Sequence, residues 1–164
     1  HPAVCVSWSD ARSFCTWLSR KSGKMVVLPT EAQWEYACRA GSKGLYCFGD
    51  DASELGYYAW YWDNAYENGI HTQPVGQKKP NSFGLYDMHG NVWEWCRDWY
   101  DSNYYAKAKN VDPENTTEAK YRVLRGDAWL AHPRHCRSAN RGREIVVLRV
   151  HGFRVAVVDG SSVD

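Results

Sequence analysis

Residues 28–37 read LPTEAQWEYA, which combines the start signal of a helix with the beginning of its apolar face. Thr30 is placed to cap the helix, and Gln33, three residues later, completes a capping box. Glu31 carries a negative charge in the first turn, where it complements the helix dipole. The apolar side chains that follow at helical spacing are Trp34, Ala37 and Cys38. We therefore expect a short helix that begins after Thr30 and stops at the RAG of residues 39–41.

Upstream of this stretch, residues 7–22 predict a second short helix. Ser7 and Asp10 form another capping box, and Gly23 supplies the stop. The expected buried face consists of Ala11, Phe14, Cys15 and Leu18. Two helices of this length can cover only part of a chain of 164 residues.

Downstream, from residue 41 to residue 120, regular periodicity fades and Gly, Asn, Asp and Pro interrupt the chain every few residues. Tryptophans at positions 60, 62, 93, 95 and 99 are placed to anchor these loops onto a small sheet. Residues 104–120 are polar and predict a surface loop. Strand signals return at residues 121–125 and 153–158. The expected class is α+β, with two short helices, small antiparallel sheets and little regular secondary structure.

Length and charge set limits on the class of protein. The chain fits one domain over residues 1–164, and its net charge of +1 argues against a generally basic nucleic-acid binder. No apolar run reaches the roughly 20 residues of a membrane helix, so we expect no membrane insertion of this chain. The six cysteines are widely spaced and form no CxxC pair, which favours free, mostly buried thiols.

Several strings, in this order, resemble the formylglycine-generating-enzyme (sulfatase-modifying factor) domain family. The matching strings are VSWSDA (6–11), LPTEAQWEYA (28–37), PVG (74–76), NSFGLY (81–86), GNVWEW (90–95) and GFR (152–154). Each string is weak alone, but together they span nearly the whole chain. The resemblance implies a much-decorated C-type lectin fold, of which this chain is the C-terminal part, without the usual N-terminal strands.

The chemistry of the family's enzymes is not expected to carry over. Those enzymes use a pair of cysteines, a few residues apart, just after a GGS[WY] turn near the C-terminus. In this chain Ala131 stands where the first cysteine would fall, and the second has no counterpart. Cys136 comes too late and alone. A metal cluster of His132, His135 and Cys136 is disfavoured, because no second group of ligands completes it.

Residues 122–154 resemble something narrower, the variable region of proteins diversified by retroelements, which typically reads RGGSW, CRSANR and GFR. Arg and Trp form the constant frame, and Trp129 is expected to anchor the contact surface. The predicted ligand-binding residues are Asp127, Ala128, Trp129, Leu130, Ala131, His132, His135, Gly142, Glu144, Ile145, Val146, Val150 and His151. A surface of this kind needs fixed residues below and changeable ones above. An undiversified relative that lacks the cysteines remains the alternative interpretation of residues 122–154.

The same stretch carries eight arginines and two acidic residues. A basic patch can attract nucleic acid. Because the arginines fall among the frame positions, we expect them to bind carbonyls and stack on Trp instead, and expect no nucleic-acid partner.

Calcium is a further implication of the resemblance, since enzymes of the family hold structural Ca²⁺ through the Asn and Glu of the GNxWEW string. The matching residues are Asn91 and Glu94, and oxygen donors suit this hard cation. Hydrogen bonds donated by turn amides to Asn91 and Glu94 are the equal alternative.

The residues and the resemblance together predict a non-catalytic binding or display protein. Its ligand would be a protein or another macromolecule, and the resemblance places it at a cell surface or outside the cell. Two alternatives remain, a formylglycine-generating oxidoreductase and a cysteine-less pseudoenzyme that regulates a partner.

Overall fold

The computed structural model describes residues 1–65, 69, 71–108, 111–145 and 148–158. Helix α1 (Trp8–Ser22) begins at the predicted Ser7 cap, with both bonds of the Ser7–Asp10 capping box present, and ends at Gly23 in the left-handed conformation. Of the predicted buried face, Ala11 and Cys15 are buried. Phe14 is 41% exposed, because its ring lies against Trp17 and Phe153 at the surface rather than in the core.

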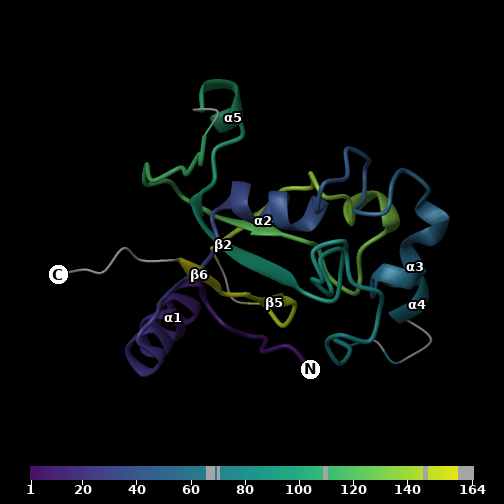
Figure 1. Cartoon of the computed structure of the whole chain (residues 1–164), viewed down its shortest axis with the longest axis horizontal. Helices are drawn as coiled ribbons and strands as arrows, with labels where there is room; N and C mark the ends of the chain where they lie inside the picture. The colour runs from purple at the N-terminus through teal and green to yellow at the C-terminus, as the bar shows by residue number, and fades with distance from the viewer. Residues whose placement is uncertain (66–68, 70, 109–110, 146–147, 159–164) are drawn as a thin grey trace.

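Helix α2 (Glu31–Arg39) follows the sequence prediction closely. Thr30 and Gln33 form both bonds of the capping box, and the helix ends at Ala40 in the left-handed conformation. Trp34 and Cys38 are buried. In Figure 1 this helix lies along the central strand of the larger sheet.

The larger sheet has the strand order β4-β3-β2-β5. Its strands are β2 (Trp93–Trp99), β3 (Arg122–Arg125), β4 (Gly142–Glu144) and β5 (His151–Gly152). Strands β3 and β4 pair in antiparallel fashion, but β5 runs parallel to β2. The sheet is therefore mixed, and the expectation of purely antiparallel sheets was wrong at this edge.

A second sheet pairs β1 (Met25–Val27) with β6 (Ala156–Val158), antiparallel, beside α1 (Figure 1). The strand predicted at residues 121–125 is thus confirmed as β3, whereas only the last part of 153–158 forms a strand. The side chains of β6 are mostly exposed, because β6 is an edge strand of a two-stranded sheet and pairs with β1 alone.

Short helical turns and loops complete the chain. The turns are η1 (Ala52–Glu54), α3 (Leu55–Tyr58), α4 (Trp62–Ala65), α5 (Tyr104–Lys107) and η2 (Pro133–His135). Indole groups hold loops to the frame as expected: Trp8 Nε1 donates to Cys96 O and Trp95 Nε1 to Val6 O, both at 2.9 Å. All six cysteines are free, and four of them are buried. Among the described residues, no helix has the length and apolar character needed to cross a membrane.

Candidate binding surface

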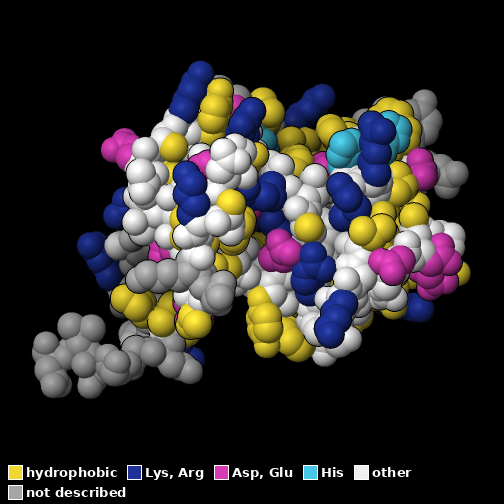
Figure 2. All heavy atoms as spheres, turned by 90° about the horizontal axis from the view of Figure 1, so that it is seen from above, with side chains coloured by type: hydrophobic (Ala, Val, Ile, Leu, Met, Phe, Trp, Pro, Cys, Tyr) yellow, Lys and Arg dark blue, Asp and Glu magenta, His cyan; other side chains and the backbone are white. Residues whose placement is uncertain are grey.

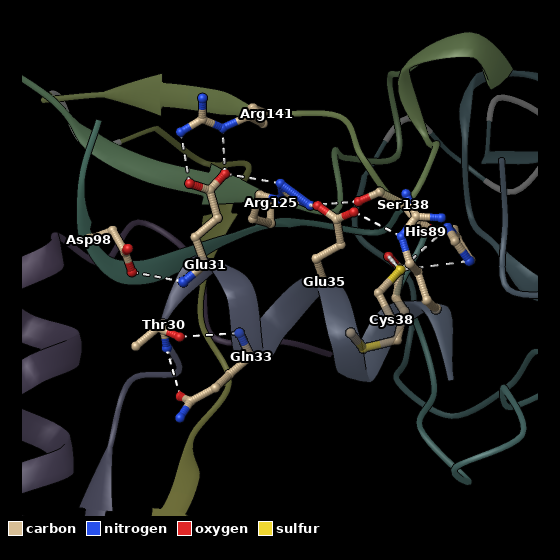
Figure 3. A network of polar contacts seen from close by, with 12 residues as sticks. Thr30, Glu31, Gln33, Glu35, Cys38, His89, Asp98, Arg125, Ser138 and Arg141 are labelled. Atoms are coloured by element: carbon tan, nitrogen blue, oxygen red, sulfur yellow. Dashed lines mark hydrogen bonds and ion pairs between the residues drawn. The ribbon is translucent and has the colours of Figure 1, made fainter. Parts of the chain in front are cut away.

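A buried ionic network ties α2 to the C-terminal half of the chain (Figure 3). The Glu31 carboxylate, itself buried, accepts from Arg125 Nη1 at 3.0 Å and from Arg141 Nε and Nη2 at 2.7 and 2.8 Å. Arg125 is fully buried, and its Nη2 also donates to Glu35 at 2.5 Å and to the Ser138 carbonyl at 2.6 Å. Because the fork of a guanidinium matches several oxygens at once, one arginine joins three segments of the chain.

Other frame arginines behave in the same way. Arg154 donates to both carboxylate oxygens of Glu94, at 2.5 and 2.7 Å, and to Tyr86 O. Arg122 lies between the rings of Trp8 and Trp99. The predicted structural role of these arginines is confirmed at positions 122, 125, 141 and 154.

The predicted calcium ligands are engaged by protein groups. Asn91 Oδ1 accepts from Gln73 N and its Nδ2 donates to Gln73 O, both at 3.0 Å. Glu94 accepts from Trp34 Nε1 at 2.7 Å in addition to Arg154. The alternative, hydrogen bonding to backbone amides, therefore describes Asn91, whereas the Glu94 partners are side chains.

The side-chain oxygens of Asn91 and Glu94 thus accept hydrogen bonds from protein donors in this conformation. The acidic oxygen without a hydrogen-bond partner in the cleft beside them is Asp87 Oδ1, and burial raises the pKa of that carboxyl. Calcium binding thus stays a proposal.

The predicted contact residues divide into buried and exposed groups. The buried ones are Asp127, Ala128, Trp129, Ala131, Val150 and His151. Leu130, His132, His135 and Ile145 are exposed, Gly142 and Glu144 are half-buried, and Val146 lies outside the described residues. The six buried residues pack into the scaffold, so their assignment to the contact surface is corrected. Trp129 in particular joins Ala65, Ala128 and Val150 in a core cluster instead of anchoring a ligand.

Asp127 illustrates why these positions are internal. Its backbone is left-handed (φ 62°), its Oδ1 accepts from Ala128 N at 2.8 Å, and burial raises the pKa of the carboxyl to about 7. The side chain therefore closes its own turn rather than facing a partner.

The exposed residues between Leu130 and His135 form a surface that we call the 130–135 loop. Leu130 is 43% exposed, and Arg134 Nε donates to His135 Nε2 at 3.1 Å. Figure 2 shows histidine side chains gathered with Lys or Arg and hydrophobic side chains on one face of the molecule. The loop is held from below, since Trp62 N donates to Ala131 O at 3.0 Å and Tyr46 Oη to Pro133 O at 2.9 Å.

Trp62 is the residue of this surface that the sequence did not reveal. Its ring is 42% exposed and its centroid lies 6.2 Å from that of His132. An exposed tryptophan is a frequent anchor of protein contacts. Its distance in sequence from residues 122–154 hid it, and the aromatic run of residues 57–62, at whose end it stands, was the available signal.

The 130–135 loop itself contains no cysteine, and the cysteines elsewhere in the described chain are free. Ala131, which the sequence resemblance places at the first family cysteine, is buried. Cys136 is buried with its Sγ 3.8 Å from His132 O, and burial raises the pKa of its thiol far above the ordinary value. Within the described part of the chain, no group of three or more His, Cys, Asp or Glu is arranged to hold a metal ion, which includes His132, His135 and Cys136.

A second thiol lies near an imidazole deeper in the fold. Cys38 Sγ is 3.8–3.9 Å from the ring nitrogens of His89, whose Nδ1 lies 2.8 Å from Cys136 O (Figure 3). Burial lowers the pKa of His89 to about 4 and raises that of Cys38 to about 12, so both groups are neutral at pH 7. A neutral thiol beside a neutral imidazole is not an activated nucleophile.

Comparisons with known proteins agree with this architecture. A formylglycine-generating enzyme of Streptomyces coelicolor is 41% identical over 145 residues, which cover 83% of this chain and 44% of that protein. The serine/threonine-protein kinase Pkn1 of Chlamydia trachomatis is 35% identical over 163 residues, covering 95% of this chain and 24% of that protein. The chain thus spans less than half the length of either relative.

Two solved structures share the fold. PvdO from Pseudomonas aeruginosa superposes with a TM-score of 0.85 at 36% identity, covering 96% of this chain and 62% of that one. Treponema denticola variable protein 1 superposes with a TM-score of 0.87 at 29% identity, covering 94% and 70%. The family model described as the sulfatase-modifying factor enzyme 1-like domain matches residues 1–158, and the chain therefore belongs to that family.

Proposed function

We propose that this chain is a non-catalytic member of its family that binds a macromolecular ligand through the 130–135 loop. The observation that carries the proposal is that Ala131 is buried while its neighbours Leu130 and His132 are exposed. A thiol is missing where the family's enzymes need one, while the residues around it point outward. Exposed side chains beside a position without a thiol support binding rather than catalysis at this loop.

The chemistry of the loop suits a protein ligand. Leu130 offers apolar area, His132 and His135 offer imidazoles, Arg134 a cation and Trp62 a large aromatic face. Protein interfaces favour this mixture of aromatic, aliphatic and arginine side chains. Hydrogen bonds to the Ala131 and Pro133 carbonyls already fix the backbone of the loop. Little conformational entropy is therefore lost when it binds a ligand.

A finer proposal is that a retroelement diversifies the exposed positions. Likeness to a protein described as a variable protein supports it, and so does the mixed chemistry of Leu130, His132, His135 and Ile145. A reverse-transcriptase gene next to this gene, with a near-repeat of the segment that encodes residues 122–154, is the expected finding. Absence of both would leave an undiversified pseudoenzyme that regulates a partner. Binding at a cell surface or outside the cell is proposed on the same likeness.

Site-specific photo-crosslinking tests the binding function. A benzophenone amino acid at position 130 should yield one adduct in extracts and medium of the source organism, whereas the same group at position 36, 69% exposed on α2, should not. Excess unmodified chain should abolish the adduct, and a Leu130→Asp/His135→Asp chain should not. Equal adducts from both positions, or competition by the double variant, would contradict binding through this loop.

The rival function is oxidation of a substrate cysteine, favoured by the 41% identity to a formylglycine-generating enzyme. The purified chain is incubated aerobically with a cysteine-containing sulfatase peptide and copper, and the peptide mass is followed. We expect no conversion. Turnover of the peptide would refute the non-catalytic assignment directly, whatever the crosslinking shows.

A further inference from the structure

A cleft of about 320 Å³ lies between α1 and the strands β1 and β2. Its floor is apolar, since Cys15, Val26 and Leu28 are all buried there. In Figure 1, α1 lies at the opposite end of the molecule from α4, which carries the 130–135 loop through Trp62. The cleft is therefore separate from the proposed binding surface.

Two indole rings and a guanidinium form one wall. Arg122 is stacked between Trp8 and Trp99, with its Cζ 3.6 and 3.4 Å from the two ring centroids, and its Nη1 donates to Arg97 O at 2.7 Å. Planar stacking of this kind fixes the guanidinium in one orientation. Burial, and then the charge of Arg12, lower the pKa of Arg122 to about 10, so it remains cationic at neutral pH.

The cleft has more positive charge than its own acid can balance. Arg12, Arg97 and Arg122 line it, and Glu114 is its one acidic lining residue. Arg97 Nη2 pairs with Glu114 at 2.6 Å. Arg12 lies 5.7 Å above the Trp8 ring and makes no ion pair with the described residues. Among the described residues neither Arg12 nor Arg122 forms an ion pair, although the more distant carboxylates of Glu118, Asp98 and Glu114 favour the charged form of Arg122.

We propose that this cleft binds a small carboxylate with an apolar body. The carboxylate would lie between Arg12 and Arg122, where charge-assisted bonds are strong, and the apolar body would cover Cys15, Val26 and Leu28. The volume is at the small end of the range of roughly 300–1,000 Å³ typical of ligand sites, which suits a chain of about eight carbons. Charge complementarity and the apolar floor together select an anionic amphiphile over a neutral or cationic one.

Calorimetric titration with octanoate, 1-octanol and octylamine tests both parts of the proposal. Octanoate should bind with one site per chain, and the two analogues of the same length should bind at least about tenfold more weakly, because they lack the negative charge. Equal affinity for octanoate and octanol would remove the role of the arginines. Absence of octanoate binding up to millimolar concentration would overturn the proposal.

Arg12→Gln is the decisive variant, because Arg12 is exposed and holds no structural ion pair among the described residues. It should weaken octanoate binding about tenfold without lowering the melting temperature. Arg20→Gln, on the same helix but outside the cleft, is the matched control and should change nothing. Unchanged affinity in Arg12→Gln would contradict the assigned headgroup position.

A second variant checks the location independently. Thr16→Trp, at the exposed rim of the cleft, should fill the mouth and abolish octanoate binding while the chain stays folded. Octanoate binding that persists in a folded Thr16→Trp chain would show that the ligand lies elsewhere.

Discussion

Single residues in this fold make contacts that their neighbours in sequence do not predict. Glu31 is predictable as a charge that complements the α2 dipole, yet its principal partners are Arg125 and Arg141, more than ninety residues away. Without the fold, nothing in the sequence joins these positions. The same limit explains why Ala128 and Trp129 were expected at the surface: their periodicity is irregular, and only the packing against Val150 shows that they are internal.

At this scale we predict the effect of removing one charge from the buried network. Glu31→Gln leaves Arg125 and Arg141 without their shared anion, and should lower the free energy of unfolding by about 3–5 kcal/mol, as measured by urea denaturation. Glu114→Gln breaks the partly exposed pair with Arg97 and should cost no more than about 1 kcal/mol. Similar losses in the two variants would show that the network does not stabilise the fold as argued.

Elements were predictable where local chemistry specifies them. The two capping boxes located α1 and α2 to within a residue, because a cap is a local device. Strand β2 was missed as a strand, since its WEWCRDW sequence is buried in a pattern that does not alternate cleanly. The parallel pairing of β5 depends on the path of the intervening loops, which no local signal encodes.

The turn that leads into β2 gives the prediction at this scale. A Cβ at Gly90 would lie 2.2 Å from the Trp60 carbonyl oxygen, which also accepts from Asn91 N at 2.8 Å. Gly90→Ala should therefore destabilise the protein by at least about 2 kcal/mol through overpacking against backbone. Gly84→Ala, which is strained in φ but has open space around it, should cost about 1 kcal/mol. Thermal unfolding of both variants separates steric clash from strain; the reverse order would contradict the close approach.

For the molecule as a whole, the predicted α+β class with little regular structure is confirmed. The free energy of unfolding should depend on pH through two buried groups, Asp127 and His89, which act in opposite directions. Burial raises the pKa of Asp127 from 3.8 to about 7, so the folded state holds an extra proton and loses stability as pH rises from about 4 to 7. His89, with its pKa lowered from 6.5 to about 4, acts in the other direction: stability is lost as pH falls through that range.

Asp127→Asn isolates the first contribution, because asparagine tolerates the left-handed backbone at this position. The variant should match the wild type near pH 4 and become more stable than it by about 2–4 kcal/mol at pH 8. Chemical denaturation of both proteins across this range gives the difference directly. A constant difference at every pH would show that the carboxyl titrates normally.

The carboxylate of Glu31 has a consequence for how this architecture can change over time. Arg125 and Arg141 both donate to it, so the two ends of the segment that carries the exposed 130–135 loop are held at one carboxylate. Lengthening the exposed loop would cost little free energy in chain entropy, about 0.6 kcal/mol for each doubling of its length. Peptides inserted near Pro133 should therefore leave the rest of the molecule intact. The 130–135 loop could then acquire new binding specificities by becoming longer as readily as by substitution.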